Sequence, residues 1–405
     1  MGKMTTEQIR AEFAQLERQV YGRPLVYLDN AATSLRPRSV VDCLVEMCTR
    51  SNSNIHRAVH CVAQEATDFY EQARESVRAH IGAPSASNVI FTSGATASIN
   101  LVAFTYGESQ VGEGDEIIVS AAEHHSNIVP WQLLCERKGA RLKVLEVDDD
   151  GHLRLDTLGE LLGSGRVKLL CVSQVSNVLG LENPLGEIVG AAHAADVPVL
   201  VDGAQGIVHG GVNVSALGCD FYAFSGHKVY AATGTGVLYM SDRWIDTLGP
   251  WQGGGEMIES VKWSGTSFAA RSERFEAGTP NFNAVPTFKP ALELAEQMGE
   301  NGEITSYLLE ELPRIAGLKL YGIPRREGEK KPIFSFTVQG AHHEDLALIM
   351  DKMGIALRSG QMCAEPLMDR FGVSGMLRAS FAPYNSMQEA EYFVKSLVKA
   401  IKMLV

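Results

Sequence analysis

Two polar segments of this chain each follow directly on an apolar run, and they carry a carboxylate and an amine. The segments are Asp202-Gly203-Ala204-Gln205 and Ser225-Gly226-His227-Lys228. Apolar runs of this kind predict buried strands, so both polar segments are expected at strand ends. A lysine amine can form a Schiff base with an aldehyde, and a carboxylate can keep a pyridine nitrogen protonated. Lys228 and Asp202 therefore predict a site for pyridoxal 5′-phosphate (PLP).

A phosphate-binding feature stands earlier in the chain. Gly94-Ala95-Thr96 closes a predicted strand and opens an apolar helix over residues 97–104. Backbone N–H groups at a helix start, such as that of Ala95, can bind a phosphate together with the Thr96 hydroxyl. His124 follows another predicted strand, where a flat imidazole can stack on a pyridine ring and move protons. The adjacent His125 is expected to be structural.

The elements that must position these residues alternate between helix and strand from about residue 60 to 240. Apolar residues recur at spacings of three and four from Val62 to Ile81, which predicts a helix that ends at Gly82. Repeated βα units predict an α/β fold with a mostly parallel sheet covered by helices on both faces. The predicted strands are 89–91, 117–119, 144–147, 167–172, 199–201 and 221–224, and the helices between them include 131–138, 157–162 and 185–195.

Ligands of such sheets bind beyond the carboxyl ends of the strands. Polar residues follow five of the predicted strands, so we expect them to converge on one edge of the sheet. They are Ser93 to Thr96, Glu123 to His125, Gln174 with Asn177, Asp202 with Gln205, and Ser225 to Lys228.

The chain is long enough, at 405 residues, for two domains. We expect an N-terminal segment over residues 1–25 that packs with the small domain, a large α/β domain over 26–285, and a small α+β domain over 286–405. Within the small domain, Gly328-Glu329-Lys330-Lys331 is expected to be an exposed turn.

Composition excludes several classes of function. A net charge of -12 argues against a nucleic-acid partner, and no apolar run approaches the roughly 20 residues that span a membrane. Residues 1–13 are polar and lack the apolar core of a signal peptide. The seven cysteines include no Cys-x-x-Cys pair, so we expect neither disulfides nor a metal site, and a cytoplasmic location.

Six motifs together resemble one family, the SufS-type (group II) cysteine desulfurases. These belong to the class V branch of fold-type I PLP-dependent enzymes, which also includes selenocysteine lyases. The likeness extends over nearly the whole chain. The motifs cover residues 27–33 (YLDNAAT), 123–131 (EHHSNIVPW), 175–180 (VSNVLG), 201–205 (VDGAQ), 224–228 (FSGHK) and 274–281 (RFEAGTPN).

The resemblance implies a role for each site residue. Lys228 would be the Schiff-base lysine, Asp202 would face the pyridine nitrogen and His124 would stack on the ring. Gln205 would face the phenolic oxygen, with Asn177 close by. The phosphate would be held by Thr96, Ala95, Ser225 and His227, with Thr279 reaching in from the second subunit of a homodimer. Arg378 would bind the substrate carboxylate bidentately, with Arg358, Asn177 and His56 also expected near the substrate.

Cys363 lies in a glycine-containing loop, Arg358-Ser359-Gly360-Gln361-Met362-Cys363. The resemblance implies that its thiolate takes the sulfur of L-cysteine as a persulfide and leaves L-alanine. The sulfur would pass to an acceptor protein, for iron-sulfur cluster assembly or another transfer pathway. A free thiol is only a few per cent ionised at neutral pH, and Arg358 is near enough in sequence to raise that fraction.

Three readings remain open. Besides desulfuration of L-cysteine, the same cofactor would support selenocysteine lysis, or β-elimination from cystine-like substrates with Cys363 dispensable. The third reading is a PLP-binding paralogue with little turnover. It is motivated by departures from the family's pattern at Ala58, Ala95, Ala97, Gln174, Ala231, Ala232, Gln361 and Met362.

Overall fold

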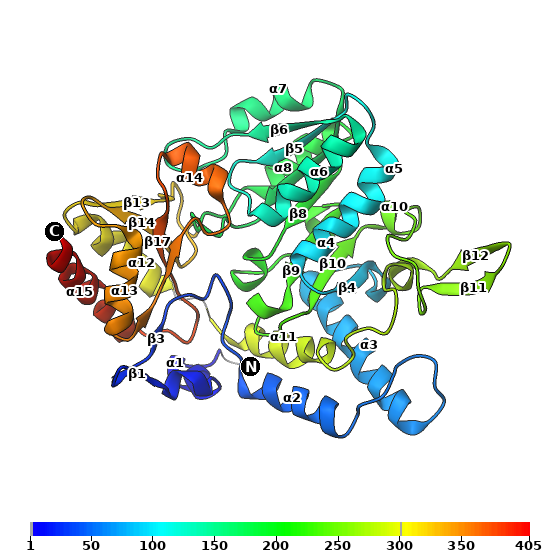
Figure 1. The fold of residues 1–405 in the computed structure, drawn as a ribbon, viewed down its shortest axis with the longest axis horizontal. Helices are drawn as coiled ribbons and strands as arrows, with labels where there is room; N and C mark the ends of the chain where they lie inside the picture. Colours follow the sequence, from blue (N-terminus) through cyan, green and yellow to red (C-terminus); the bar gives the residue numbers. More distant parts are fainter. Residues whose placement is uncertain (1–2, 300–301) are drawn as a thin grey trace.

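A computed structural model describes residues 3–299 and 302–405 of the chain, and its centre is a seven-stranded sheet (Figure 1). Every strand is parallel to the others except β10, which is antiparallel to both of its neighbours. This arrangement confirms the mostly parallel sheet. In spatial order the strands are β4 (Val89–Thr92), β10 (Gly236–Met240), β9 (Phe221–Ser225), β8 (Val199–Asp202), β7 (Val167–Ser173), β5 (Glu116–Ser120) and β6 (Arg141–Leu145).

Both faces of this sheet are buried. In β8, Val199 and Val201 belong to one apolar cluster and Leu200 to another, as the alternation of side chains along a strand requires. The first cluster includes residues of α2 (Arg38–Thr49), α3 (Cys61–Ile81), α7 (Leu158–Leu162), α8 (Leu185–Ala194) and α11 (Phe288–Gln297). The second includes residues of α4 (Ala95–Val102), α6 (Val129–Lys138) and α10 (Asp242–Ile245). Two short helices, α5 (Glu108–Gln110) and α9 (Val214–Leu217), lie in connections.

Helix α3 forms where the apolar spacing predicts it. The His60 ring accepts a hydrogen bond from the backbone N–H of Ala63 and caps the start. Gly82 ends the helix with a φ of 65°, a left-handed conformation that glycine adopts without a steric penalty.

A smaller antiparallel sheet forms the C-terminal part of the molecule, with a core of its own. This is the α+β unit that the sequence predicts. Its strands in order are β13 (Leu318–Tyr321), β14 (Ile333–Val338), β17 (Met376–Ser380) and β16 (Arg358–Gly360). Its helices are α12 (Gly302–Glu311), α13 (His343–Lys352), α14 (Glu365–Phe371) and α15 (Met387–Leu404).

The N-terminal segment lies against both parts of the chain. Arg10 of α1 (Thr6–Ala11) donates to the carbonyl of Tyr384 at 2.6 Å and pairs with Glu389 at 3.0 Å. The segment also forms the hairpin β1 (Gln19–Val20) and β2 (Arg23–Pro24), and β3 (Val26–Tyr27) pairs with β15 (Ile355–Ala356) of the smaller unit. Helix α11, which follows the expected boundary at residue 286, packs on α2 and α3 of the large unit.

The expectation of an exposed turn at residues 328–331 is wrong. Glu329, Lys330 and Lys331 are buried. The ammonium of Lys330 donates to three backbone carbonyls, those of Leu179, Tyr321 and Gly322. Charge-rich composition predicted exposure, but these carbonyls satisfy the ammonium inside the protein.

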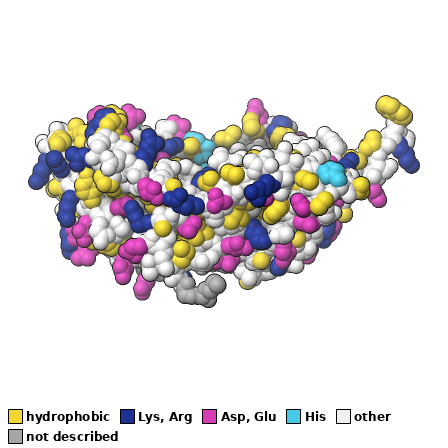
Figure 2. Space-filling view, turned by 90° about the horizontal axis from the view of Figure 1, so that it is seen from below, with side chains coloured by type: hydrophobic (Ala, Val, Ile, Leu, Met, Phe, Trp, Pro, Cys, Tyr) yellow, Lys and Arg dark blue, Asp and Glu magenta, His cyan; other side chains and the backbone are white. Residues whose placement is uncertain are grey.

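One hairpin projects from the large unit, formed by β11 (Ile258–Lys262) and β12 (Gly265–Phe268). Figure 2 shows this projection in profile, with hydrophobic side chains at its tip. The side chains of Val261 and Trp263 are exposed, and Trp263 is as accessible as in an extended peptide. Among the described residues, no helix is both long and apolar enough to cross a bilayer.

Candidate active site

A cavity of about 180 Å³ lies at the carboxyl edge of the seven-stranded sheet. The sheet brings five strand ends to this edge, because β4, β5, β7, β8 and β9 point the same way. Most of the predicted site residues line it: Ala95, Thr96, His124, Asn177, Asp202, Ser225, His227 and Lys228 from the large unit, and Arg358, Cys363 and Arg378 from the smaller one.

The amine and the acid of the site lie on neighbouring strands. Asp202 ends β8, and Lys228 lies in the turn directly after β9. Burial raises the pKa of Asp202, and the charge of Lys228 opposes that rise. Burial lowers the pKa of Lys228 to about 8, with Asp202 acting in the opposite direction. The neutral amine, which is the form that attacks an aldehyde or takes a proton, is therefore accessible near neutral pH.

His124 is a neutral imidazole at pH 7. Burial lowers its pKa to about 4, and the positive charge of Lys228 adds to this effect. The backbone N–H of Ser126 donates to Nδ1 of the ring at 3.1 Å, so Nδ1 is unprotonated and Nε2 carries the hydrogen. A neutral ring can stack on a second aromatic ring without bringing another charge into the cavity.

One end of the cavity is lined by donors suited to a phosphate. The hydroxyl of Ser225 accepts a hydrogen bond from the backbone N–H of Ala95 at 2.8 Å, which joins β9 to the start of α4. Thr96 lies next to this helix start, where the aligned N–H groups favour an anion. His227 contacts Thr33 through Nδ1 at 3.2 Å, and its other ring nitrogen forms no hydrogen bond among the described residues.

Two arginines that also line the cavity share one carboxylate. Arg378 is buried and lies 3.2 Å from Asp29, while the half-exposed Arg358 lies 3.6 Å from the other oxygen of Asp29. A second nitrogen of Arg378 donates to the carbonyl of Asn177 at 2.8 Å. Its Nε is buried and has no partner among the described residues. Two guanidinium groups against one carboxylate leave a net positive charge that can bind an incoming carboxylate.

These groups fit PLP and an amino acid. An amine, a carboxylate, a flat imidazole and hydroxyl donors surround one small space, and the unpartnered Nε of Arg378 marks a donor without an acceptor. Such a buried orphan donor is rare in folded proteins, and a ligand carboxylate would satisfy it.

Cys363 is an exposed residue that lines this space. It follows β16 in a loop from the smaller unit and lines the cavity together with residues of the large unit.

The side-chain amides of two predicted site residues, Gln205 and Asn177, donate to backbone carbonyls of the protein. Gln205 is buried, and its Nε2 donates to the carbonyl of Ala31 at 2.7 Å. Asn177 lines the cavity, but its Nδ2 donates to the carbonyl of Met362 at 2.9 Å. The structure therefore shows the Asn177 amide bound to the loop of Cys363.

His56 and Thr279 lie outside this cavity. His56 contacts Glu71 at 3.1 Å and lines a separate hollow with Arg57 and Pro280. Thr279 precedes Pro280 in the chain. Both residues therefore belong to a surface region away from Lys228 of the same chain.

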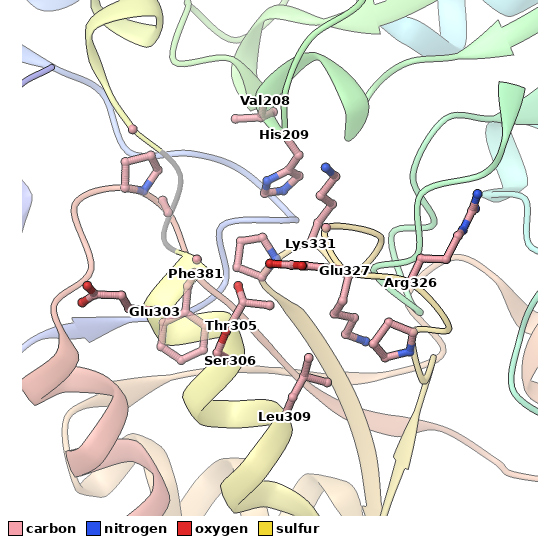
Figure 3. Close-up of a pocket in the computed structure, with 18 of the residues that line it drawn as sticks. Val208, His209, Glu303, Thr305, Ser306, Leu309, Arg326, Glu327, Lys331 and Phe381 are labelled. Carbon is pink, nitrogen blue, oxygen red and sulfur yellow. The ribbon is translucent and has the colours of Figure 1, made fainter. Parts of the chain in front are cut away.

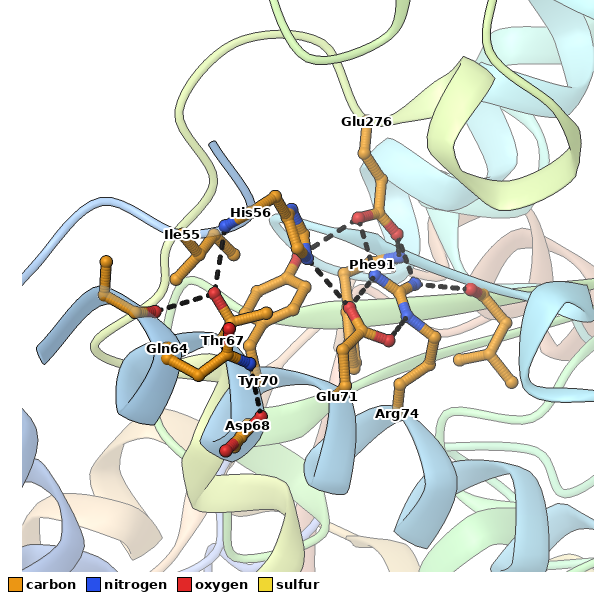
Figure 4. Close-up of polar contacts among 12 residues, drawn as sticks. Ile55, His56, Gln64, Thr67, Asp68, Tyr70, Glu71, Arg74, Phe91 and Glu276 are labelled. Atoms are coloured by element: carbon orange, nitrogen blue, oxygen red, sulfur yellow. Dashed lines mark hydrogen bonds and ion pairs between the residues drawn. The ribbon is translucent and has the colours of Figure 1, made fainter. Parts of the chain in front are cut away.

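The segment before Thr279 is anchored by a buried ion pair (Figure 4). Glu276 accepts two hydrogen bonds from Arg74 of α3, at 2.7 and 3.0 Å. It also accepts from the backbone N–H of Phe91 at 2.7 Å and from the hydroxyl of Tyr70 at 3.1 Å. A helix, a strand and the 271–281 segment are fixed to one another at this point.

The departures from the family's pattern lie mostly away from the chemistry. Of the eight positions, only Ala95 and Met362 line the cavity. Gln174 accepts from the hydroxyl of Tyr222 at 2.7 Å and donates to the carbonyl of Gly211 at 2.9 Å, so its amide is occupied within the fold.

A larger cavity, of about 910 Å³, lies between the two units (Figure 3). His209 and Lys331 lie near each other in its wall, but its cationic side chains already have partners within the chain. Lys330 binds carbonyls, and the others pair with carboxylates: Arg325 with Asp148, Arg326 with Glu329, and Lys331 with Glu182. The reactive groups are in the smaller cavity, and we place the site there.

Sequence reasoning missed two residues next to the site. Asp29 lies in a motif that the resemblance uses, yet only the structure shows that it bridges Arg358 and Arg378. His125 was expected to be structural, and the structure places it in contact with the loop that carries Cys363. The carboxylate within residues 27–33 was a signal for the first; nothing in the sequence signalled the second.

Comparisons with known proteins agree along the whole chain. The family model described as aminotransferase class-V matches residues 26–393. A cysteine desulfurase of Cronobacter sakazakii is 42% identical over 98% of this chain and 98% of its own. A probable cysteine desulfurase of Vibrio cholerae is 40% identical over 99% of this chain and all of its own.

Solved structures show the same likeness. The apo structure of a cysteine desulfurase from Thermococcus onnurineus superposes with a TM-score of 0.94 at 35% identity and covers both chains completely. An Escherichia coli cysteine desulfurase in an S-sulfonic acid form superposes with a TM-score of 0.90 at 37% identity, over 99% of this chain and 100% of its own.

Proposed function

Since the chain belongs to the class-V aminotransferase family, we propose that it is a PLP-dependent cysteine desulfurase that converts L-cysteine to L-alanine and keeps the sulfur on Cys363. One observation carries the proposal. A single small cavity contains the amine of Lys228, the carboxylate of Asp202, the guanidinium of Arg378 and the thiol of Cys363. Full-length desulfurase relatives at about 40% identity support it.

Each residue of the proposed site has a role that follows from its chemistry. The guanidinium of Arg378, which lines the cavity, would bind the substrate carboxylate and orient the amino acid. Lys228, with a pKa of about 8, takes the α-proton. The bound cofactor supplies an electron sink for the charge that this proton leaves behind. Asp202 would hold the ring nitrogen of the cofactor in its protonated form, and the neutral imidazole of His124 would stack on the ring.

Cys363 then receives the sulfur. Its thiolate attacks the substrate sulfur, an S–S bond forms and the substrate C–S bond breaks. The electron pair of the C–S bond stays on the substrate carbon, which takes up protons and leaves as alanine. Cys363 is an exposed residue, which suits transfer of the persulfide sulfur to an acceptor protein.

The decisive experiment is Cys363→Ala with L-cysteine and PLP. Cofactor binding and binding of L-cysteine should persist, because neither needs the thiol. Alanine release should stop, and wild-type protein halted early should carry one extra sulfur on Cys363 and on none of the other six cysteines. Cys48→Ala, at an exposed cysteine on α2, is the matched control and should behave as wild type.

The other readings predict different products. β-Elimination would give pyruvate and ammonia, and Cys363→Ala would form them as fast as the wild type does. A paralogue without turnover would form neither alanine nor pyruvate. Selenocysteine lysis would persist in Cys363→Ala, since selenium leaves more readily than sulfur. If Cys363→Ala released alanine from L-cysteine at the wild-type rate, the persulfide mechanism would be excluded.

The proposal extends to a homodimer in a reducing cytoplasm. The hairpin supports a partner copy, because it exposes Val261, Trp263 and Phe268 together, and grouped exposed apolar side chains mark association surfaces. Thr279 lies too far from its own cavity to line it, as expected for a residue that reaches a neighbouring phosphate site. Seven free thiols suit a reducing compartment.

A further inference from the structure

The loop that carries Cys363 has a backbone conformation that needs external support. Met362 and Cys363 have φ values of 53° and 55°. The left-handed region is disfavoured for residues with a Cβ. In the described part of the chain, these two are the only consecutive non-glycine residues with positive φ. Contacts from outside the loop must therefore stabilise it.

The large unit provides those contacts. The side chain of Met362 is buried in the main apolar core, and its carbonyl accepts from Nδ2 of Asn177 at 2.9 Å. The carbonyl of Cys363 itself accepts from the backbone N–H of His125 at 2.7 Å. The reactive residue is thus bound to the segment that follows β5.

The His125 ring makes a second contact on the far side of Cys363. Its Nε2 accepts from the backbone N–H of Glu365 at 3.0 Å. Glu365 is the first residue of α14. Ala364 offers no side chain to cap this helix, and Pro366 has no N–H. The imidazole therefore caps α14 from a segment about 240 positions away.

We propose that His125 is a positioning residue for Cys363. This inference rests on the proposed function, in which Cys363 is the nucleophile. Because a backbone N–H is the donor, Nε2 of His125 must be unprotonated and the ring neutral. Loss of this acceptor frees the start of α14, and the backbone of Cys363 relaxes from its left-handed conformation. The thiol then leaves the position in which it lines the cavity with Lys228 and Arg378.

The consequence is confined to the sulfur step. Arg378 and Lys228 lie on β17 and after β9, so binding of L-cysteine and of PLP does not depend on this contact. A displacement of about 1 Å at a reacting atom can slow a reaction about a hundredfold.

The test compares two variants of the PLP-loaded enzyme. In His125→Phe, a ring without an acceptor, the first turnover of L-cysteine to alanine should slow at least tenfold and the Glu365 amide should exchange hydrogen faster. In His125→Gln, whose Oε1 can replace Nε2, both readouts should return to within about threefold of wild type. The cofactor absorbance and the KM for L-cysteine should remain unchanged in both.

Two controls keep the result interpretable. Gln361→Ala removes only a side-chain contact between Gln361 and Glu365 on the same loop, and it should leave both readouts as in wild type. If His125→Phe fails to fold, His125→Asn gives the same comparison, because its shorter amide cannot reach Glu365.

Two results would overturn the inference. The first is that His125→Phe completes its first turnover at the wild-type rate although the Glu365 amide exchanges hydrogen faster. The second is an equal loss in His125→Phe and His125→Gln. Failure of the proposed function looks different, since Cys363→Ala would then form alanine as fast as wild type.

Discussion

At the scale of single residues, burial moves the pKa values of the site in opposite directions. It lowers the pKa of Lys228 to about 8 and that of His124 to about 4. It raises the pKa of the buried Glu123 to about 7, against hydrogen bonds from Ser120 and Asn127. Each shift favours the uncharged form, as expected for groups removed from water. The site therefore contains an amine and an imidazole that can both act as neutral groups near pH 7.

Lys228 is the residue whose role can be tested most directly. After borohydride reduction of the wild type, mass spectrometry should find PLP on Lys228. Lys228→Ala should carry no covalent cofactor and should form alanine at least about a hundredfold more slowly, because the proton acceptor is lost. Lys395→Ala, at an exposed lysine of α15, should match the wild type. PLP found on any other lysine would contradict the site.

At the scale of elements, the site depends on parallel strands and on the segments fixed to them. The Arg74–Glu276 pair joins α3 to the segment that carries Thr279, and both side chains are at least nine-tenths buried. A buried charge that loses its partner is strongly destabilising, while the intact pair satisfies both charges. This pair is therefore a structural requirement of the region expected to meet a second subunit.

Glu276→Gln keeps the shape of the side chain and removes its charge. The free energy of unfolding should fall by about 3 kcal/mol, because the buried Arg74 keeps only the more exposed Glu71 as a counter-charge. Urea unfolding at one protein concentration measures this change. Glu75→Gln removes the exposed partner of the partly exposed Arg78 and should hardly change the urea midpoint of unfolding. If both variants lowered the free energy of unfolding equally, the buried Arg74–Glu276 pair would stabilise the protein no more than an exposed pair does.

At the scale of the whole molecule, two units of the chain line one candidate site. The large unit supplies the groups that are proposed to bind the cofactor, and the smaller unit supplies Arg358, Cys363 and Arg378. The cavity therefore exists only when the units are packed together. A second copy would add the Thr279 segment.

The dimer can be tested through the exposed hairpin. Sedimentation should show wild-type dimers, and Trp263→Ser should raise the dimer dissociation constant at least about tenfold, since buried tryptophans often dominate interfaces. Leu348→Ser, at an exposed leucine of α13, should leave the dimer intact. An active wild-type monomer at dilution would contradict the proposal.

His209 in the larger cavity should make stability depend on pH. Burial lowers its pKa to about 3, with further lowering by Lys331 and Lys228. Between pH 6.5 and pH 3 the unfolded chain binds a proton at this residue that the native protein does not, so stability falls as the pH falls. Between pH 7 and pH 5, wild type should lose about 2 kcal/mol more than His209→Gln in urea unfolding. Identical losses in both proteins would show that His209 titrates normally.

Much of the fold and of the site was predictable because the signals are local. The apolar runs of β4, β5, β7, β8 and β9 and the helical spacing of α3 are properties of contiguous residues. The polar residues that end those strands converge because parallel strands share a direction. The motifs around Lys228, Asp202 and Cys363 added the chemistry.

Other features exist only through contacts between distant segments. The antiparallel direction of β10, the burial of Lys330 among three carbonyls and the bridge from Asp29 to two arginines leave no local pattern. The contact of His125 with the Cys363 loop joins positions about 240 residues apart. A sequence alone determines which residues prefer burial or a given backbone shape. Packing decides which carbonyls bind the ammonium of Lys330 and which imidazole caps α14, because only the folded chain brings those groups within hydrogen-bond distance.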